Sequence, residues 1–229
     1  MSHAPRGERT AGAARPLLKV LPLGTYLTVS DTKKTLRLSG FLLAVGLLPL
    51  VASAAPTVNT LGGDTRVQLS PDLTGALTSL GVSVKASYPA RLRGASATFP
   101  IPGGELDLAS LKGEVDHAGG LTLRAGATEV NLSSYTIDTT GTAPVLTGLV
   151  KLNDSVLGRL PLFDITLVGA PVVRGRHARV GSLQLDNAQL TLNGEAAEAL
   201  NAVFNVSAFQ AGLPVGTARV HTYFYEPAP

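Results

Sequence analysis

Side chains able to act as a base at neutral pH are few in this chain. The sequence has four histidines and no cysteine, and three of the histidines, His117, His177 and His221, follow residue 54. Neutral imidazole is a common ligand of copper and zinc. No two of the three stand at the i,i+2 or i,i+4 spacing that builds half a metal site. A metal centre therefore requires all three to converge from distant strands, as in a copper-dependent redox enzyme such as a superoxide dismutase.

Recognisable catalytic motifs are missing from the sequence. It has no G-x-S-x-G elbow, no phosphate-binding loop, no H-E-x-x-H pair and no dinucleotide fingerprint. Without cysteine, a thiol nucleophile is excluded. A triad assembled from distant segments remains open, because triads are spatial arrangements. The sequence favours a non-catalytic binding protein over an enzyme.

A basic run, RGRHAR, occupies residues 174–179 and contains Arg174, Arg176 and Arg179 around His177. Two interpretations remain open. The run is a solvated loop between strands, or it forms an edge that contacts carboxylates, phosphates or acidic glycans. The planar guanidinium fork suits the second role.

Short alternating segments must position these side chains. Nine of them, rich in Val, Leu, Thr and Ile, are typical of strands: VSVKA (82–86), ASATFPI (95–101), LKGEV (111–115), LTLRA (121–125), EVNLSSYTI (129–137), VLTGLVKL (145–152), RLPLFDITLV (159–168), RVGSLQLDNAQLTL (179–192) and GTARVHTYF (216–224). We expect hairpin turns at Gly119-Gly120, within EVDHAGGLTL, and at Asn153-Asp154. Spacing near ten residues is typical of an antiparallel sandwich or barrel. We predict an all-β protein with an antiparallel β-sandwich.

Two segments depart from this pattern in the same way. VQLSPDLTGALTSL (67–80) and LTLNGEAAEALNAV (190–203) each end a strand and continue with an N-cap residue, Ser70 or Asn193. Apolar residues at helical spacing follow each cap. We therefore predict two short α-helices, near 71–80 and 194–204.

The N-terminal residues resemble a secretory signal. Lys33, Lys34 and Arg37 form a basic region, an apolar run covers 41–52, and Ala52-Ser53-Ala54 supplies a small-x-small cleavage site. The apolar run is too short to span a bilayer, which takes about 20 helical residues, so no transmembrane anchor is expected. We expect an N-terminal extension and cleaved signal peptide over 1–54, and a single β-sandwich domain over 55–229. The protein is expected to be periplasmic, envelope-associated or secreted in a bacterium.

Removing residues 1–54 reverses the net charge. The whole chain has 19 Lys and Arg against 16 Asp and Glu, but 7 of those basic and only 2 of those acidic residues precede position 55. The remainder holds 12 basic and 14 acidic residues. This balance excludes the basic field of a nucleic-acid-binding surface. Another envelope protein or a surface polymer is the expected partner.

The segment 81–147, GVSVKASYPARL…FPIPGGELDLASLKGEVDHAGGLTLRAGATEVNLSSYTIDTT…PVLTG, resembles the HtaA family, exported haem-binding domains of bacterial cell-surface haem uptake. The shared features are a serine-aromatic pair, an F-P-x-x-G-G segment, and a loop histidine with glycine before an L-T-L strand. The resemblance implies a β-sandwich with two short helices. It also implies that Tyr88 ligates haem iron and that His117 supports it.

Three hypotheses therefore stand. The first is an exported, non-catalytic envelope protein that binds a partner surface or a small ligand. The second is a haem-binding module that uses Tyr88 and His117. The third is a copper enzyme built on His117, His177 and His221.

Overall fold

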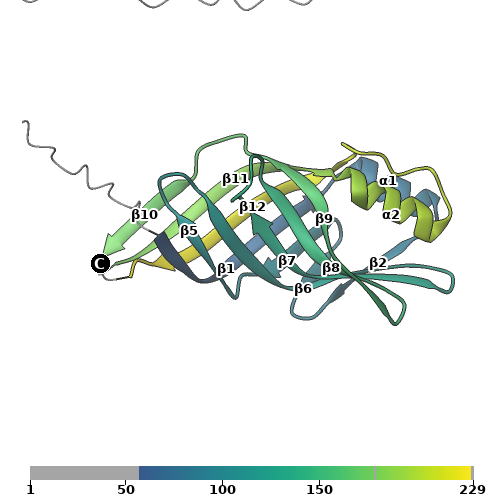
Figure 1. Ribbon diagram of the computed structural model, residues 1–229, viewed down its shortest axis with the longest axis horizontal. Coiled ribbons are helices and arrows are strands. Elements are labelled where there is room, and N and C mark those ends of the chain that lie inside the picture. The colour runs from purple at the N-terminus through teal and green to yellow at the C-terminus, as the bar shows by residue number, and fades with distance from the viewer. Residues whose placement is uncertain (1–56, 178, 228–229) are drawn as a thin grey trace, which may run out of the picture. The chain divides into compact units, whose positions relative to one another are not determined.

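The computed structural model describes residues 57–177 and 179–227 (Figure 1). The predicted signal peptide and extension, residues 1–54, lie outside this range. Within it, the chain is mostly antiparallel strand with two short helices, and the predicted all-β sandwich is confirmed.

The elements follow one another in a simple order. They are β1 (Thr57–Leu69), α1 (Pro71–Ser79), β2 (Ser83–Ser87), β3 (Arg91–Arg93), β4 (Ser96–Pro100), β5 (Gly103–Asp107), β6 (Gly113–Ala125), β7 (Thr128–Asp138), β8 (Val145–Leu152), β9 (Ser155–Thr166), β10 (Val172–His177), β11 (Val180–Leu192), α2 (Gly194–Phe204) and β12 (Pro214–Tyr225).

Strand pairing closes the sheet on itself. From β5 through β9, each strand pairs with the next in sequence; β9 pairs with β11, and β5 pairs with β1. β12 lies between β1 and β11 and pairs with both, which completes a ring of eight strands. β2, β4 and β10 are added at the sides of this ring, and β3 pairs with β4. Closure leaves the ring strands few open edges.

Both predicted helices are present, and both lie at the same end of the domain (Figure 1). The Ser70 hydroxyl accepts a hydrogen bond from the Leu73 amide at 3.0 Å, and the Asn193 side chain accepts one from the Glu195 amide at 3.0 Å. Each cap therefore satisfies an amide at a helix start. Neither helix of the described residues is long and apolar enough to cross a bilayer.

Two sequence-based expectations about local structure are wrong. EVDHAGGLTL does not turn at Gly119-Gly120; it runs through one strand, β6, with an irregularity in pairing between His117 and Gly120. The two glycines form a bulge in this strand, and a bulge needs the same backbone freedom as a turn. Most of RGRHAR is not a loop: residues 174–177 belong to β10, which, among the described strands, pairs with β11 alone. The Asn153-Asp154 turn is confirmed between β8 and β9.

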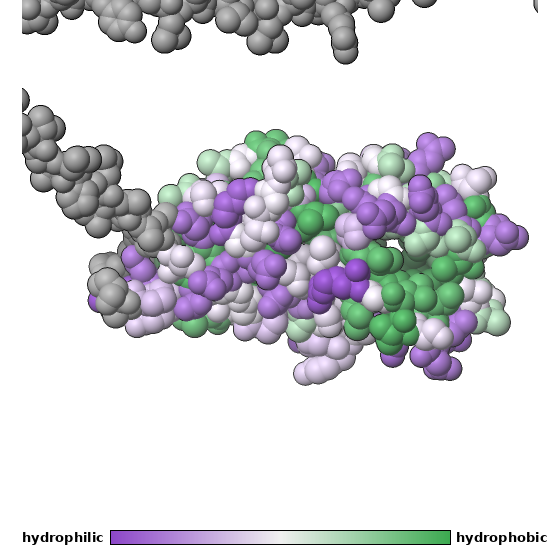
Figure 2. Space-filling model, viewed as in Figure 1, coloured by the Kyte–Doolittle hydropathy of each residue, from purple (hydrophilic) through white to green (hydrophobic). Residues whose placement is uncertain are grey.

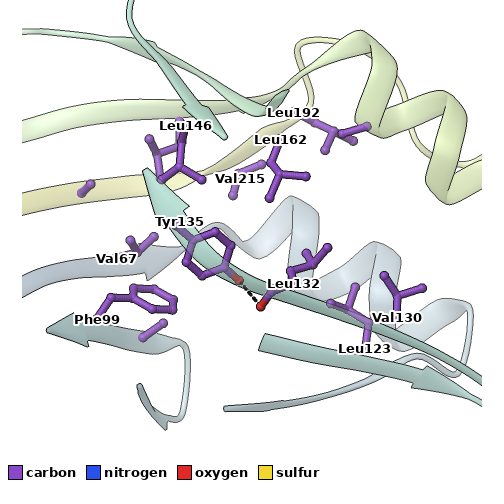
Figure 3. Packing of buried hydrophobic residues seen from close by; sticks show 14 of the residues in the cluster. Val67, Phe99, Leu123, Val130, Leu132, Tyr135, Leu146, Leu162, Leu192 and Val215 are labelled. Atoms are coloured by element: carbon purple, nitrogen blue, oxygen red, sulfur yellow. Dashed lines mark hydrogen bonds between the residues drawn. The ribbon is translucent and has the colours of Figure 1, made fainter. Parts of the chain in front are cut away.

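The interior holds two apolar clusters. The larger is built around residues such as Phe99, Tyr135, Leu146 and Leu192, several of which Figure 3 shows between the strands and helices. The smaller contains Val58, Ile101, Leu106, Val115, Leu183, Val220 and Phe224. Both side-chain sets come from alternate positions of the strands, as the sandwich prediction requires.

Candidate functional site

The bulge in β6 brings the chain after β2 close to the sheet. Gly119 has φ +87°, and a Cβ there would lie 2.3 Å from the Ala90 amide nitrogen. Only glycine allows this approach. Ala90 is buried, and its amide donates a hydrogen bond to the Ser87 carbonyl at 3.0 Å. The turn that carries Tyr88 is thus anchored at its base.

Tyr88 itself points into solvent. Its side chain is 94% exposed, and its peptide bond to Pro89 is cis. Among the described residues, no hydrogen bond to the Tyr88 hydroxyl is formed, so the phenol oxygen is accessible to a ligand. An exposed tyrosine on an anchored turn can coordinate a metal that approaches from outside the domain.

His117, unlike Tyr88, lies inside the domain. It is 4% exposed, and its Nε2 is 2.6 Å from the hydroxyl oxygen of Thr65 on β1. Burial lowers the pKa of His117 to about 4, opposed by the Val115 backbone carbonyl and the Asp116 carboxylate. His117 is therefore neutral at physiological pH. Its Nδ1 is buried and has no partner with hydrogen-bond geometry.

Tyr88 and His117 are near in the strand register but not in contact. Ser87, directly before Tyr88, pairs with Gly120 of β6, three residues after His117. Yet the Tyr88 side chain is exposed and that of His117 is buried. Within residues 57–177 and 179–227, no hydrogen bond or ring contact joins the two. Their joint role in binding haem stays a prediction.

A polar face, which the sequence analysis did not identify, lies beside Tyr88. It consists of Lys85, Ser87, Thr122, Asn131 and Lys151. Thr122 pairs with Lys85 on one side and Asn131 on the other, and Asn131 pairs with Lys151, so all four lie on one face of the sheet. Asn131 Nδ2 donates to Thr122 Oγ1 at 2.9 Å and to Ser87 Oγ at 3.3 Å. Two lysines thus flank a hydrogen-bonded group.

This face points away from the core. Val84 and Ala86, which alternate with Lys85 and Ser87, pack against the larger cluster. Alternation in β2 alone predicts an outward Lys85. The register of β2, β6, β7 and β8 is also needed to place Lys85 and Lys151 in the same row, and the sequence does not provide it.

The three histidines predicted to share a metal do not form a described cluster. His221 is half-buried on β12, and its ring stacks edge-on against that of Tyr223 with centroids 5.0 Å apart. His117 faces the interior, and the side chain of His177 lies outside what the structure describes. Among the described residues, no group of three His, Asp or Glu side chains is placed to hold a metal ion.

The arginines of the basic run lie at the side of the domain. Arg174, on β10, and Arg179, in the turn to β11, are exposed. The side chain of Arg176 lies outside what the structure describes. An anion-contacting role for Arg174, Arg176 and Arg179 stays a prediction.

Three adjoining cavities run through the interior. The central one, of about 80 Å³, is lined by Thr65, His117 and apolar side chains that include Phe99, Tyr135 and Leu146. A second, of about 40 Å³, lies between α2 and β9, and a third, of about 80 Å³, extends toward Leu183 and Val220. Each is far smaller than the roughly 300 Å³ at which pockets for drug-sized ligands begin. None has room for a porphyrin.

Comparison of sequences finds no matching protein-family model and no matching curated protein. Comparison of folds finds several similar solved structures. The C-terminal domain of HtaA from Corynebacterium glutamicum is 11% identical, with a TM-score of 0.55 over 73% of this chain and 99% of that domain.

Two further structures from the same organism are less similar. The N-terminal domain of HtaA is 11% identical, with a TM-score of 0.49 over 74% of this chain and 99% of that domain. The heme binding protein HtaB is 13% identical, with a TM-score of 0.45 over 73% of this chain and 94% of that protein. At such low identity only the fold is comparable. The described domain has an HtaA-like fold, as the resemblance at residues 81–147 predicted.

Proposed function

We propose that this chain is a non-catalytic binding domain of the bacterial cell envelope and that its ligand is haem, coordinated by Tyr88. One observation carries the proposal: in an HtaA-like fold, the tyrosine of the Ser87-Tyr88 pair is 94% exposed on an anchored turn. The main alternative, a partner surface or another small ligand, has no equally specific residue to support it.

The chemistry of the surroundings fits a haem that binds from outside. Phenolate oxygen is a known axial ligand of haem iron. The two haem carboxylates need cationic or hydrogen-bonding partners, and Lys85 and Lys151 flank such groups on the polar face next to Tyr88. The interior cavities are small compared with the macrocycle, which supports a haem that binds at the outer surface.

The role of His117 in haem binding differs from that of Tyr88. The resemblance implies that His117 supports the ligating tyrosine, but its Nε2 is paired with Thr65 inside the domain. Coordination of iron is therefore assigned to Tyr88. Support from His117 requires that one of its two buried ring nitrogens, the unpaired Nδ1 or the Nε2 now paired with Thr65, reach the Tyr88 hydroxyl when haem binds.

Titration with hemin, followed by the Soret band, tests the proposal. The wild-type protein should give a saturable shift, and Tyr88→Phe, which removes only the ligating oxygen, should weaken binding about tenfold or more and change the spectrum. Tyr223→Phe, at a tyrosine that is also 50% exposed, is the matched control and should behave as the wild type. A Tyr88→Phe spectrum identical to the wild type would contradict coordination by Tyr88.

Export is the second part of the proposal. It is supported by the basic, apolar and small-residue order of residues 33–54. N-terminal sequencing of the protein recovered from the native cell envelope should begin at Ala55. A mature protein that retains residues 31–54 would contradict a cleaved signal.

A further inference from the structure

The three apolar cavities lie next to one another in a series. The cavity next to α2 and the central cavity share Leu132, Phe163, Leu192 and Leu200 in their linings. The central and third cavities share Thr65, Val67, Leu146 and Leu190. Cavities lined by the same side chains are separated by no more than those side chains. Small rotamer changes therefore suffice to join them.

Their linings offer little to a polar ligand, and the buried Nδ1 of His117 is the unpaired polar atom that the described residues place in the central lining. In the central cavity, the Thr65 hydroxyl is already paired with His117, and the Tyr135 hydroxyl donates to the Leu132 carbonyl at 3.0 Å (Figure 3). In the third, the Thr139 hydroxyl bonds the carbonyls of Leu111 and Gly113. Apolar cavities of this kind stay dry and take up apolar molecules.

The series reaches the surface beside α2. The small side chains of Ala196 and Ala199 on α2 face Leu157 and Leu160 on β9 across the outermost cavity. Leu157 is 49% exposed and its neighbour Val156 is 61% exposed. Figure 2 shows hydrophobic residues gathered at the end of the domain that carries the helices, around a hollow. This is an apolar mouth.

We propose that the domain binds a straight hydrocarbon chain, the acyl chain of a fatty acid or a lipid, threaded from this mouth into the interior. The shape decides between apolar ligands: each cavity is too small for a fused-ring ligand, whereas a thin flexible chain can fill several small cavities in succession. This site is separate from Tyr88, which lines none of the three cavities, and the proposal does not depend on haem binding.

The first test uses cis-parinaric acid, a fluorescent straight-chain fatty acid, and the full chain, which contains no tryptophan to interfere. Its fluorescence should rise saturably with the wild-type protein. Ala199→Phe fills the mouth and should weaken binding about tenfold or more. Ala202→Phe, at an exposed position of the same helix, should bind as the wild type. No saturable signal, or equal binding by both variants and the wild type, would overturn the proposal.

A second test needs no variant, so it holds even where Ala199→Phe fails to fold. Unlabelled saturated fatty acids of increasing length compete with the probe. Affinity should rise steadily with chain length until the series is filled, because each added methylene is buried. A length-independent affinity overturns the proposal, because a chain that enters the interior buries each added methylene. Phosphatidylcholine vesicles, incubated with the protein without the probe and then removed by sedimentation, distinguish the two sources. Phospholipid that stays with the protein assigns the site to lipid acyl chains, and uptake of free acids alone assigns it to fatty acids.

Discussion

The hydroxyl of Thr65 and the Nε2 of His117 lie 2.6 Å apart in the interior and join β1 to β6. Thr65 is 3% exposed and His117 is 4% exposed, so neither group has access to water when its partner is removed. An unpaired buried polar group costs about 1–3 kcal/mol.

Thr65→Val should therefore destabilise the domain by about 1–3 kcal/mol, because it leaves both nitrogens of His117 without a partner. Thr65→Ser keeps the hydroxyl and should lose less. Urea unfolding of both variants measures the difference. A Thr65→Val variant as stable as the wild type would show that the hydrogen bond contributes nothing to stability.

Stability should fall as the pH falls from about 6.5 to 4. The pKa of His117 is about 4 in the folded chain and 6.5 without burial, so between these values the unfolded chain binds a proton that the folded chain does not. The difference amounts to roughly 3 kcal/mol at most. His117→Leu should flatten the melting temperature across this window. The carboxyls of Asp107 and Asp138 have lowered pKa values, so the stability that they contribute is lost only at more acidic pH.

Loss of the hydroxyl should lower the stability of the domain at Tyr135 but hardly change it at Tyr88. The Tyr135 hydroxyl accepts from the Leu121 amide and donates to the Leu132 carbonyl, so it pairs backbone groups near the bulge. Tyr135→Phe leaves them unsatisfied and should cost about 1–3 kcal/mol. Tyr88→Phe, at the surface, should change stability by less than about 0.5 kcal/mol. Thermal unfolding of both variants gives the comparison; equal melting temperatures would contradict this role of Tyr135.

Gly119→Ala should displace the turn that carries Tyr88. The new Cβ would meet the Ala90 amide at 2.3 Å and lie in a left-handed backbone region. Gly126→Ala is the matched control, because Gly126 also has positive φ but has open space around it. Gly126→Ala should lower the free energy of unfolding by about 1 kcal/mol through the backbone alone. Gly119→Ala should lower it by distinctly more. The folded fraction of Gly119→Ala should bind hemin more weakly than the wild type in a titration, whereas Gly126→Ala should bind as the wild type.

The two lysines of the polar face should contribute to hemin affinity without coordinating iron. Lys85→Gln with Lys151→Gln should weaken binding a few-fold, since exposed ion pairs contribute about 0.2–1 kcal/mol each, and leave the shape of the spectrum unchanged. The weakening should shrink in high salt. Lys112→Gln, at an exposed lysine near Gly141, is the control. Unchanged affinity in the double variant would place the haem carboxylates elsewhere.

Local signals made much of the fold predictable. β8 begins and ends where its alternation predicts, and Asn153 adopts φ 51°, as a tight turn requires. Ser70 and Asn193 cap the two helices because a short polar side chain can reach the free amides of a first turn. These features depend on neighbours in sequence, which is why pattern alone identifies them.

The remainder depends on which strands meet. Gly119-Gly120 permits a turn or a bulge equally, and only pairing with β2 and β7 decides for the bulge. β10 forms because β11 offers it an edge, although R-G-R-H lacks a strand pattern. The inward direction of His117 and the row from Lys85 to Lys151 follow from strand register. No spacing in the sequence encodes that register.

The place of β12 between β1 and β11 has a consequence for how the molecule is made. The ring stays open until residues 214–225 have left the ribosome, and until then both β1 and β11 present an unpaired edge. Contacts between strands that are far apart in the sequence are slow to form. Until they form, the open edges of β1 and β11 are exposed to aggregation. We therefore expect the ring to close only after β12 has been made. A domain whose ring is still open is one that a translocation pore can thread, which fits the proposed export.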